Sequence, residues 1–289
     1  MMAFWWAACL LAAEVKIPSR VAQGEVLRIE AQGAGAGWTA EGLGRSVKLF
    51  PQGEGLAAVG LWPVAALDKA GPVRVIVKDE SGRVAHEASV LVTDAHFRIR
   101  NLAPTKTMSS LKPSPGEIET AAKLVATVSE QRHWAEPLLA PTPACIISPF
   151  GVQTWYNGKP SGSYHRGIDL YSGAGTPVKA TADGTVRIAQ MWNMQGGMIG
   201  IDHGHGLIST YLHLSKLIAN EGQFVHRGDV VGLVGSTGFS TGPHLHWGLA
   251  VNGVPVNGAR WIRTMRPCGA PAAPARKKAR APVRKKTAG

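Results

Sequence analysis

The sequence is short of cysteine and of acidic side chains, and one common catalytic pattern is missing from it. Its three cysteines, Cys9, Cys145 and Cys268, do not have zinc-finger spacing, so a structural zinc finger is not expected. No H-E-x-x-H occurs in the 289 residues, which excludes the glutamate base of the common metalloproteases. The apolar run over residues 1–13 is too short to span a bilayer as a helix.

That apolar run, MMAFWWAACLLAA, ends in small residues and is interpreted as a secretory signal peptide, although it contains no Lys or Arg. The interpretation predicts an exported protein, located in the periplasm, the cell envelope or outside the cell. In such a compartment Cys145 and Cys268, the two cysteines left after signal removal, are expected to form a disulfide. Two free thiols remain the alternative.

Lysine and arginine number 31 against 19 acidic residues, which gives a formal net charge of +12. Much of the excess lies in residues 269–289, a tail built mainly of Ala, Pro, Lys and Arg. Such a tail cannot bury enough apolar surface to offset ordering, and it is predicted to be disordered. We expect it to contact anionic envelope polymers or lipids and no specific nucleic acid. Its cations are Arg276, Lys277, Lys278, Arg280, Arg284, Lys285 and Lys286.

Residues 14–95 contain short segments of alternating apolar and polar residues, separated by Gly, Pro and Asp. The clearest segments are 26–31, 73–79 and 86–92. Several strands at this spacing predict an antiparallel, immunoglobulin-like β-sandwich. No cluster of Cys, His or acidic residues occurs here, so the segment is interpreted as a spacer or binding module.

Residues 96–140 are interpreted as a linker that contains one helix. Ser114 is the expected N-cap, with Pro115 in the first turn and Glu117 three residues after the cap. Apolar residues at helical spacing continue the pattern as far as His133, and prolines follow. We expect this helix to contribute packing and no chemistry.

Residues 141–268 consist of short strand candidates between Gly-rich turns, and histidines recur among them. His244 and His246, in STGPHLHW, lie two residues apart in a predicted strand, so both imidazoles face one surface. His165 and Asp169 lie in YHRGIDL, and His213 lies in TYLHL. The strand candidates are 178–180, 184–190, 198–202, 207–212 and 230–234.

Imidazole and carboxylate groups are zinc ligands, and these three stretches supply five of them. A catalytic zinc site takes three protein ligands and keeps a fourth position for a water, whose pKa falls to roughly 7. Five groups are therefore enough for three ligands and two histidines that move protons. A histidine base would replace the missing glutamate.

The ordered set H-x-x-x-D, Y-x-H-L and H-x-H resembles the lysostaphin-type (LytM-type) zinc endopeptidases of bacterial cell walls. SPFG at 148–151, GTPVKA at 175–180 and GDVVGLVGSTG at 228–238 extend the resemblance over about residues 141–262. The resemblance implies an antiparallel β domain with a metal in a narrow groove, in a chain that is mostly β. It also implies hydrolysis of peptide cross-links or stem peptides of peptidoglycan, with Zn²⁺ as cofactor. A monomer is expected.

By the same resemblance, His165, Asp169 and His246 are the metal ligands. His244 would act as general base on the water and then as proton donor to the leaving amine. His213 would form a hydrogen bond with the same water or with the developing oxyanion.

A second H-x-H pair, His203 and His205, lies between glycines in a predicted hairpin turn and is not expected to bind metal. A serine or cysteine hydrolase is the weaker interpretation, and Cys145 precedes the histidine-bearing segment. The alternative function is a catalytically silent wall-binding or amidase-activating protein on the same fold. The five filled positions favour the enzyme.

Overall fold

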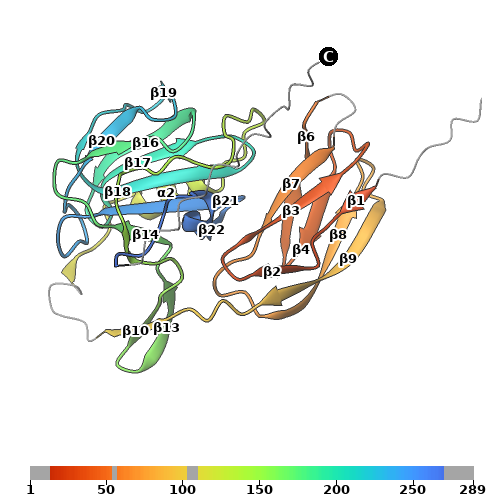
Figure 1. Cartoon of the computed structure of the whole chain (residues 1–289), viewed down its shortest axis with the longest axis horizontal. Coiled ribbons are helices and arrows are strands. Elements are labelled where there is room, and N and C mark those ends of the chain that lie inside the picture. Colours follow the sequence, from red (N-terminus) through yellow and green to blue (C-terminus); the bar gives the residue numbers. More distant parts are fainter. Residues whose placement is uncertain (1–13, 54–56, 103–109, 270–289) are drawn as a thin grey trace, which may run out of the picture.

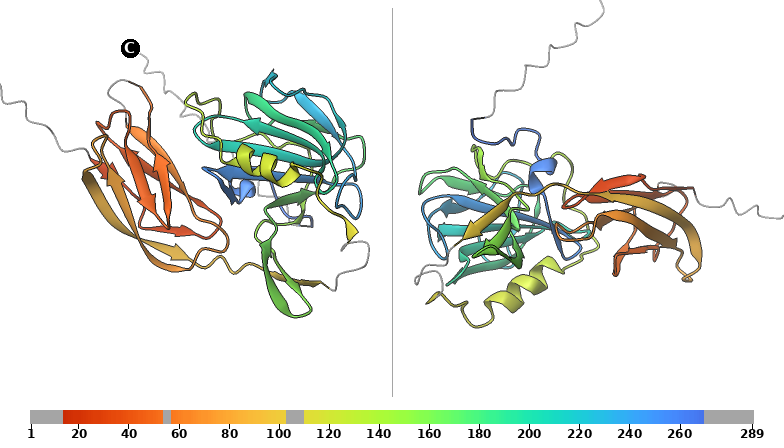
Figure 2. Two further views of the ribbon diagram at one scale, coloured as in Figure 1. Left: turned by 180° about the vertical axis from the view of Figure 1, so that it is seen from behind. Right: turned by 90° about the horizontal axis from the view of Figure 1, so that it is seen from below.

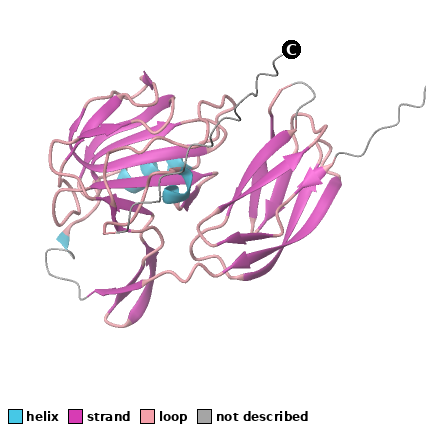
Figure 3. Cartoon of the chain, viewed as in Figure 1, coloured by secondary structure: helices cyan, strands magenta, loops and turns pink. Residues whose placement is uncertain are grey.

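The computed structural model describes residues 14–53, 57–102 and 110–269, and it shows two β domains joined by an extended connection (Figure 1). Strands dominate the described residues, as expected, and the helices are α2 (Glu117–Val125) and the short 3-10 helix η1 (Gly258–Trp261) (Figure 3). The predicted signal peptide over 1–13 and the basic tail from residue 270 onward lie outside the described ranges. Within these ranges, none of the helices has the length and apolar character needed to cross a membrane.

The N-terminal domain contains two sheets that share one apolar core. Leu27 and Trp62 from the first sheet pack with Val75 and Val90 from the second. The strand predicted over 26–31 has those bounds in the structure, and the other two predicted strands are present with shifted ends. The first sheet has the order β1 (Val15–Lys16), β3 (Val26–Ala31), β7 (Ala58–Pro63) and β6 (Phe50–Pro51). The second has the order β2 (Arg20–Ala22), β9 (Val84–Thr93), β8 (Gly71–Lys78), β4 (Thr39–Gly42) and β5 (Arg45–Lys48).

The C-terminal domain is built on a ten-stranded sheet that carries the predicted site. All its strand pairs are antiparallel. Its main order is β11 (Ile146–Ser148), β14 (Gly167–Leu170), β21 (Leu245–Val251), β18 (Leu207–Leu217), β17 (Gly196–Asp202), β16 (Gly184–Trp192) and β19 (Phe224–Val225). Beside this order lie β15 (Pro177–Lys179), β20 (Val230–Val234) and β22 (Val254–Val256).

The connection between the domains contains a strand that the sequence pattern did not reveal. β10 (Ile99–Leu102) runs parallel to β12 (Gln153–Tyr156), which forms a hairpin with β13 (Lys159–Tyr164). This three-stranded sheet projects from the C-terminal domain (Figure 1). Its strand β13 leads directly into His165.

Helix α2 is shorter than predicted, and its cap differs. Gly116 is the N-cap residue in a left-handed conformation, and the helix ends at Val125 instead of near His133. Ser114 was the wrong cap because its hydroxyl accepts a hydrogen bond from the Asn193 amide, 3.0 Å away, and not from the helix. The helix lies across one face of the ten-stranded sheet (Figure 2).

Polar and apolar contacts join the two domains. Asn252 Nδ2 donates to the Leu61 carbonyl at 2.8 Å, and the Phe50 ring stacks on His205 with centroids 3.8 Å apart. Leu61 is also part of the C-terminal core cluster. The predicted disulfide is present, and it links Cys145 to Cys268 across 123 residues of sequence.

Candidate metal centre

Two neighbouring strands place a carboxylate and an imidazole side by side. Asp169 on β14 pairs directly with His246 on β21. Because side chains alternate along a strand, Ile168 and Leu170 point into the core while Asp169 points to the opposite face. We call this face of the sheet, which carries Asp169 and His246, the site face.

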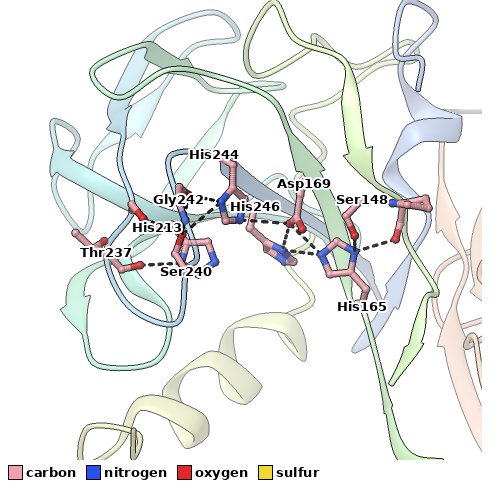
Figure 4. A network of polar contacts seen from close by, with 11 residues as sticks. Ser148, His165, Asp169, His213, Thr237, Ser240, Gly242, His244 and His246 are labelled. Carbon is pink, nitrogen blue, oxygen red and sulfur yellow. Dashed lines mark hydrogen bonds and ion pairs between the residues drawn. The ribbon is translucent and has the colours of Figure 1, made fainter. Parts of the chain in front are cut away.

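His165 completes a three-residue cluster from the short loop between β13 and β14 (Figure 4). Its Nε2 lies 3.0 Å from Asp169 Oδ1 and 3.0 Å from His246 Nδ1. His246 Nδ1 is 2.9 Å from the same Asp169 oxygen. These are the three residues predicted as metal ligands, and one ligand atom from each converges on a single point.

The hydrogen bonds of these groups leave lone pairs available for a cation at that point. His165 Nδ1 lies 2.8 Å from the Pro149 carbonyl, which can only accept, so Nδ1 bears the proton and a neutral ring presents a lone pair at Nε2. An ionised Asp169 also offers only lone pairs. Two imidazole nitrogens and one carboxylate oxygen are the donor set of a catalytic zinc site. The residues present therefore fit Zn²⁺.

The charge states of the cluster suit the same purpose. Burial opposes ionisation of Asp169, but the neighbouring imidazoles of His165 and His246 outweigh it and hold the pKa of that carboxyl far below its usual range. Burial lowers the pKa of His246, which favours the neutral ring that a metal ligand needs. Both ligands are therefore ready to bind a metal at neutral pH.

His213 and His244 lie next to the cluster, with ring centroids 4.9 Å apart. His213 Nδ1 donates to the Thr237 carbonyl at 2.9 Å, and His244 Nδ1 donates to the Gly242 carbonyl at 2.8 Å. In each neutral ring Nε2 is then the free acceptor, and His244 Nε2 is 3.7 Å from Asp169 Oδ1. Burial lowers the pKa of His213 to about 4, so its ring is neutral at pH 7.

A local distortion of β18 brings His213 to the site. Simple alternation would place His213 on the core side together with Tyr211, but its φ is +64° and the register with β17 shifts nearby. The His213 amide donates to the Gln195 carbonyl at 3.0 Å, which holds this conformation. The sequence identified the residue through the family motif, whereas the bulge that turns its ring carries no sequence signal.

The second H-x-H pair lies in the β17–β18 turn, as predicted, and outside the cluster. His203 is fully buried, with Nδ1 2.6 Å from the Asp183 carbonyl and Nε2 2.7 Å from Ser209 Oγ. His205 stacks on Phe50 at the contact between the domains. Neither residue belongs to the group of potential ligands.

One serine close to the site, Ser240, lies in a sequence pattern that serine hydrolases use for their nucleophile. Gly238–Gly242 reads GFSTG, which matches the G-x-S-x-G pattern of serine hydrolases around Ser240. A nucleophile elbow requires a turn from a strand into a helix, whereas this loop connects β20 to β21. Ser240 Oγ donates to the Gly242 carbonyl at 2.9 Å and is 3.4 Å from His244 Nδ1, a nitrogen already bound to that carbonyl. The geometry does not support a serine nucleophile.

Sequence reasoning missed the groups that orient the five site residues. Three of them are the backbone carbonyls of Pro149, Thr237 and Gly242, which no residue type can reveal. The fourth is Gly167, where an added Cβ would lie 2.6 Å from His246 Nε2. Only the packing of β14 against β21 shows why this position is glycine.

Comparisons with known proteins agree with this geometry. The sequence profile of peptidase family M23 matches residues 163–258, which include all five site residues. DD-carboxypeptidase/endopeptidase Mpg of Neisseria meningitidis is 42% identical over 118 residues, covering 39% of this chain and 26% of that protein. Peptidoglycan DD-endopeptidase ShyA of Vibrio cholerae is 45% identical over 93 residues, covering 32% of this chain and 22% of that protein. The chain thus spans about a quarter of the length of these curated relatives.

A solved structure extends the likeness beyond the matched segment. The crystal structure of a Pseudomonas aeruginosa protein assigned to peptidase M23 superimposes with a TM-score of 0.65 at 28% identity. The superposition covers 83% of this chain and 94% of that one, so it includes the N-terminal β domain.

The site thus has a His–Asp–His cluster on the face of an antiparallel sheet and two further histidines beside it. This is the arrangement of a metallopeptidase zinc site. Over residues 163–258, within its C-terminal domain, the chain matches peptidase family M23, the lysostaphin or LytM type.

Proposed function

We propose that the protein is a zinc-dependent endopeptidase that hydrolyses peptide cross-links or stem peptides of bacterial peptidoglycan. The observation that carries the proposal is the three-ligand cluster with His213 and His244 beside it. The names of both curated relatives include endopeptidase activity on DD bonds, which supports D,D cross-links as the target.

His165, Asp169 and His246 would hold the zinc, with the roles of His213 and His244 following from their free Nε2 atoms. When bound, zinc acts as a Lewis acid and lowers the pKa of its water to about 7. His244 Nε2 would accept a proton from the attacking water and later donate it to the leaving amine. His213 Nε2, an acceptor in the neutral ring, accepts a hydrogen bond from the same water and orients it.

The cellular setting is part of the proposal. A disulfide and a peptidoglycan substrate both suit the envelope, where oxidising conditions preserve the Cys145–Cys268 bond. We propose residues 14–95 as a spacer or wall-binding domain, 96–140 as the linker and 141–268 as the peptidase domain. The basic tail would hold a monomeric enzyme near anionic envelope polymers or lipids.

The metal assignment is tested with His246→Ala. This variant is expected to lose stoichiometric zinc and hydrolysis together, because one of three ligands is removed. Elemental analysis measures the zinc, and mass spectrometry of a muropeptide digest measures cleavage and identifies the bond. Full zinc content in the variant would contradict the ligand set.

The proton-transfer roles are tested with His213→Ala and His244→Ala. Both variants are expected to retain zinc and to lose about 10²–10⁴-fold in kcat, the usual contribution of general acid–base groups. Loss of the metal would show that the residue is a ligand. Wild-type protein that holds zinc and cleaves no muropeptide would instead favour a silent wall-binding role.

A further inference from the structure

A cavity of about 700 Å³ lies between helix α2 and the site face of the sheet. Its volume falls in the range of ligand pockets, roughly 300–1,000 Å³. The helix that forms its outer wall lies outside residues 163–258, the segment that matches the family profile. We call this space the α2 cavity.

The α2 cavity begins at the metal centre. His246 lines it, and so do Gly248 and Ala250, which follow on the same face of β21. Gly248 adds no side chain to the floor beside His246, and the Thr210 hydroxyl of the neighbouring strand lies next to it. An extended peptide held at the metal can therefore continue along the sheet into the cavity.

Helix α2 presents apolar side chains to this space. Ile118, Ala122 and Val125 recur at helical spacing and line the cavity. Leu124 lies on a different side of the helix and packs against the sheet at Gly200, which fixes the helix in place. Ile118 is 61% exposed, so this apolar wall is accessible from solvent.

An arginine side chain lies beside these apolar walls. Arg166 follows His165 in sequence, is exposed and lines the α2 cavity. Among the described residues its guanidinium has no acidic partner within ion-pair distance, whereas Arg45 pairs with Asp68. No Asp or Glu is among the described residues that line the cavity. The site is therefore suited to a carboxylate supplied by a ligand.

We propose that the α2 cavity is a substrate subsite that selects carboxylate-bearing, alanine-containing stem peptides over glycine bridges. Arg166 binds a free carboxylate of the peptide, and the face of α2 formed by Ile118, Ala122 and Val125 covers its methyl and methylene groups. A glycine bridge has neither a side-chain methyl group nor a side-chain carboxylate. The inference deepens the proposed function, on which it rests, by naming the substrate class and the residues that recognise it.

Binding of a product peptide, which the enzyme does not cleave further, tests the recognition of the carboxylate by Arg166 directly. The probes are the tetrapeptide L-Ala–γ-D-Glu–meso-diaminopimelate–D-Ala, the same peptide with its carboxyls amidated, and pentaglycine amide, which has no carboxylate. By calorimetry Arg166→Gln is expected to bind the free tetrapeptide about tenfold more weakly than wild type and the amidated one equally well. Arg166→Lys should recover part of the loss, and Arg263→Gln, at an exposed arginine not lining the cavity, should change nothing.

The role of the apolar wall is tested by filling part of the cavity beside it. Ala122→Leu adds bulk inside the cavity and is expected to weaken binding of the free and the amidated tetrapeptide alike. Thr120→Leu adds the same side chain on an exposed part of α2 that does not line the cavity, and it should bind as wild type does.

The outcomes separate this inference from the proposed function. Wild-type protein that cleaves peptidoglycan while Arg166→Gln and Ala122→Leu bind and cleave normally would overturn the subsite alone. Equal binding of pentaglycine amide and the free tetrapeptide would also overturn it. Zinc-loaded wild type that neither binds nor cleaves any of the peptidoglycan peptides would overturn the proposed function.

Discussion

Gly167 lies where the backbone of β14 passes close to the His246 ring. An added Cβ would meet the Trp247 carbonyl at 2.5 Å and His246 Nε2 at 2.6 Å, so the ring would have to move. We expect Gly167→Ala to lower zinc affinity about 10–100-fold, the usual effect of disturbing a group that orients a ligand. A competition titration with a zinc chelator measures this. Gly173→Ala is the control, since an added Cβ there has no neighbour within 4 Å; equal losses in both variants would refute the explanation.

His203 gives the fold a dependence on pH. Burial lowers the pKa of His203 to about 4, against about 6.5 in an unfolded chain. Between these values the unfolded state binds a proton that the folded state refuses, so stability is complete above pH 6.5 and declines as the pH falls toward 4. The shift corresponds to about 3 kcal/mol. Urea unfolding at pH 7 and pH 4.5 should show a smaller difference for His203→Gln than for wild type; an unchanged difference would remove His203 as the cause.

Helix α2 is anchored by a buried charge at its first residue. Glu117 is fully buried, and its carboxylate accepts hydrogen bonds from the amides of Ser114, Met194 and Gln195 at 2.7–3.0 Å. Glu117→Ala would leave these amides unpaired, and we expect a loss of about 1–3 kcal/mol in the free energy of unfolding. Glu119→Ala, at an exposed position of the same turn, should cost less than about 0.5 kcal/mol. Denaturant titration of both variants decides; similar costs would show that the buried carboxylate is not an anchor.

At the scale of the whole molecule, the Cys145–Cys268 bond ties the two ends of the C-terminal domain together. It closes a loop of 123 residues. Replacing both cysteines with serine is expected to lower the free energy of unfolding by about 2–5 kcal/mol, because the unfolded chain gains freedom. Urea unfolding measures the loss, and wild type unfolded under reductant should show a similar one. An unchanged midpoint in both experiments would contradict the prediction.

The sequence by itself determined the mostly β fold and the bounds of β3 and β20, and it singled out five residues that the structure brings together. Strand periodicity and a motif with fixed order are local features, and they are readable without knowing what packs on them. Asp169 was placed correctly on the face opposite Ile168 because alternation along a strand needs no tertiary information. The disulfide was expected from counting the cysteines of a chain predicted to be exported.

The tertiary structure alone decided how those residues are arranged. The bulge that turns His213 toward His244 depends on a hydrogen bond to Gln195, from a loop that Glu117 holds. The helix expected only to pack proved to wall a cavity at the metal centre, because its position over the site face depends on contacts far apart in sequence. Long-range packing decides which carbonyls accept hydrogen bonds from the histidines, where the backbone passes close to a side chain, and where a cavity forms. The residue types along the chain do not reveal these features.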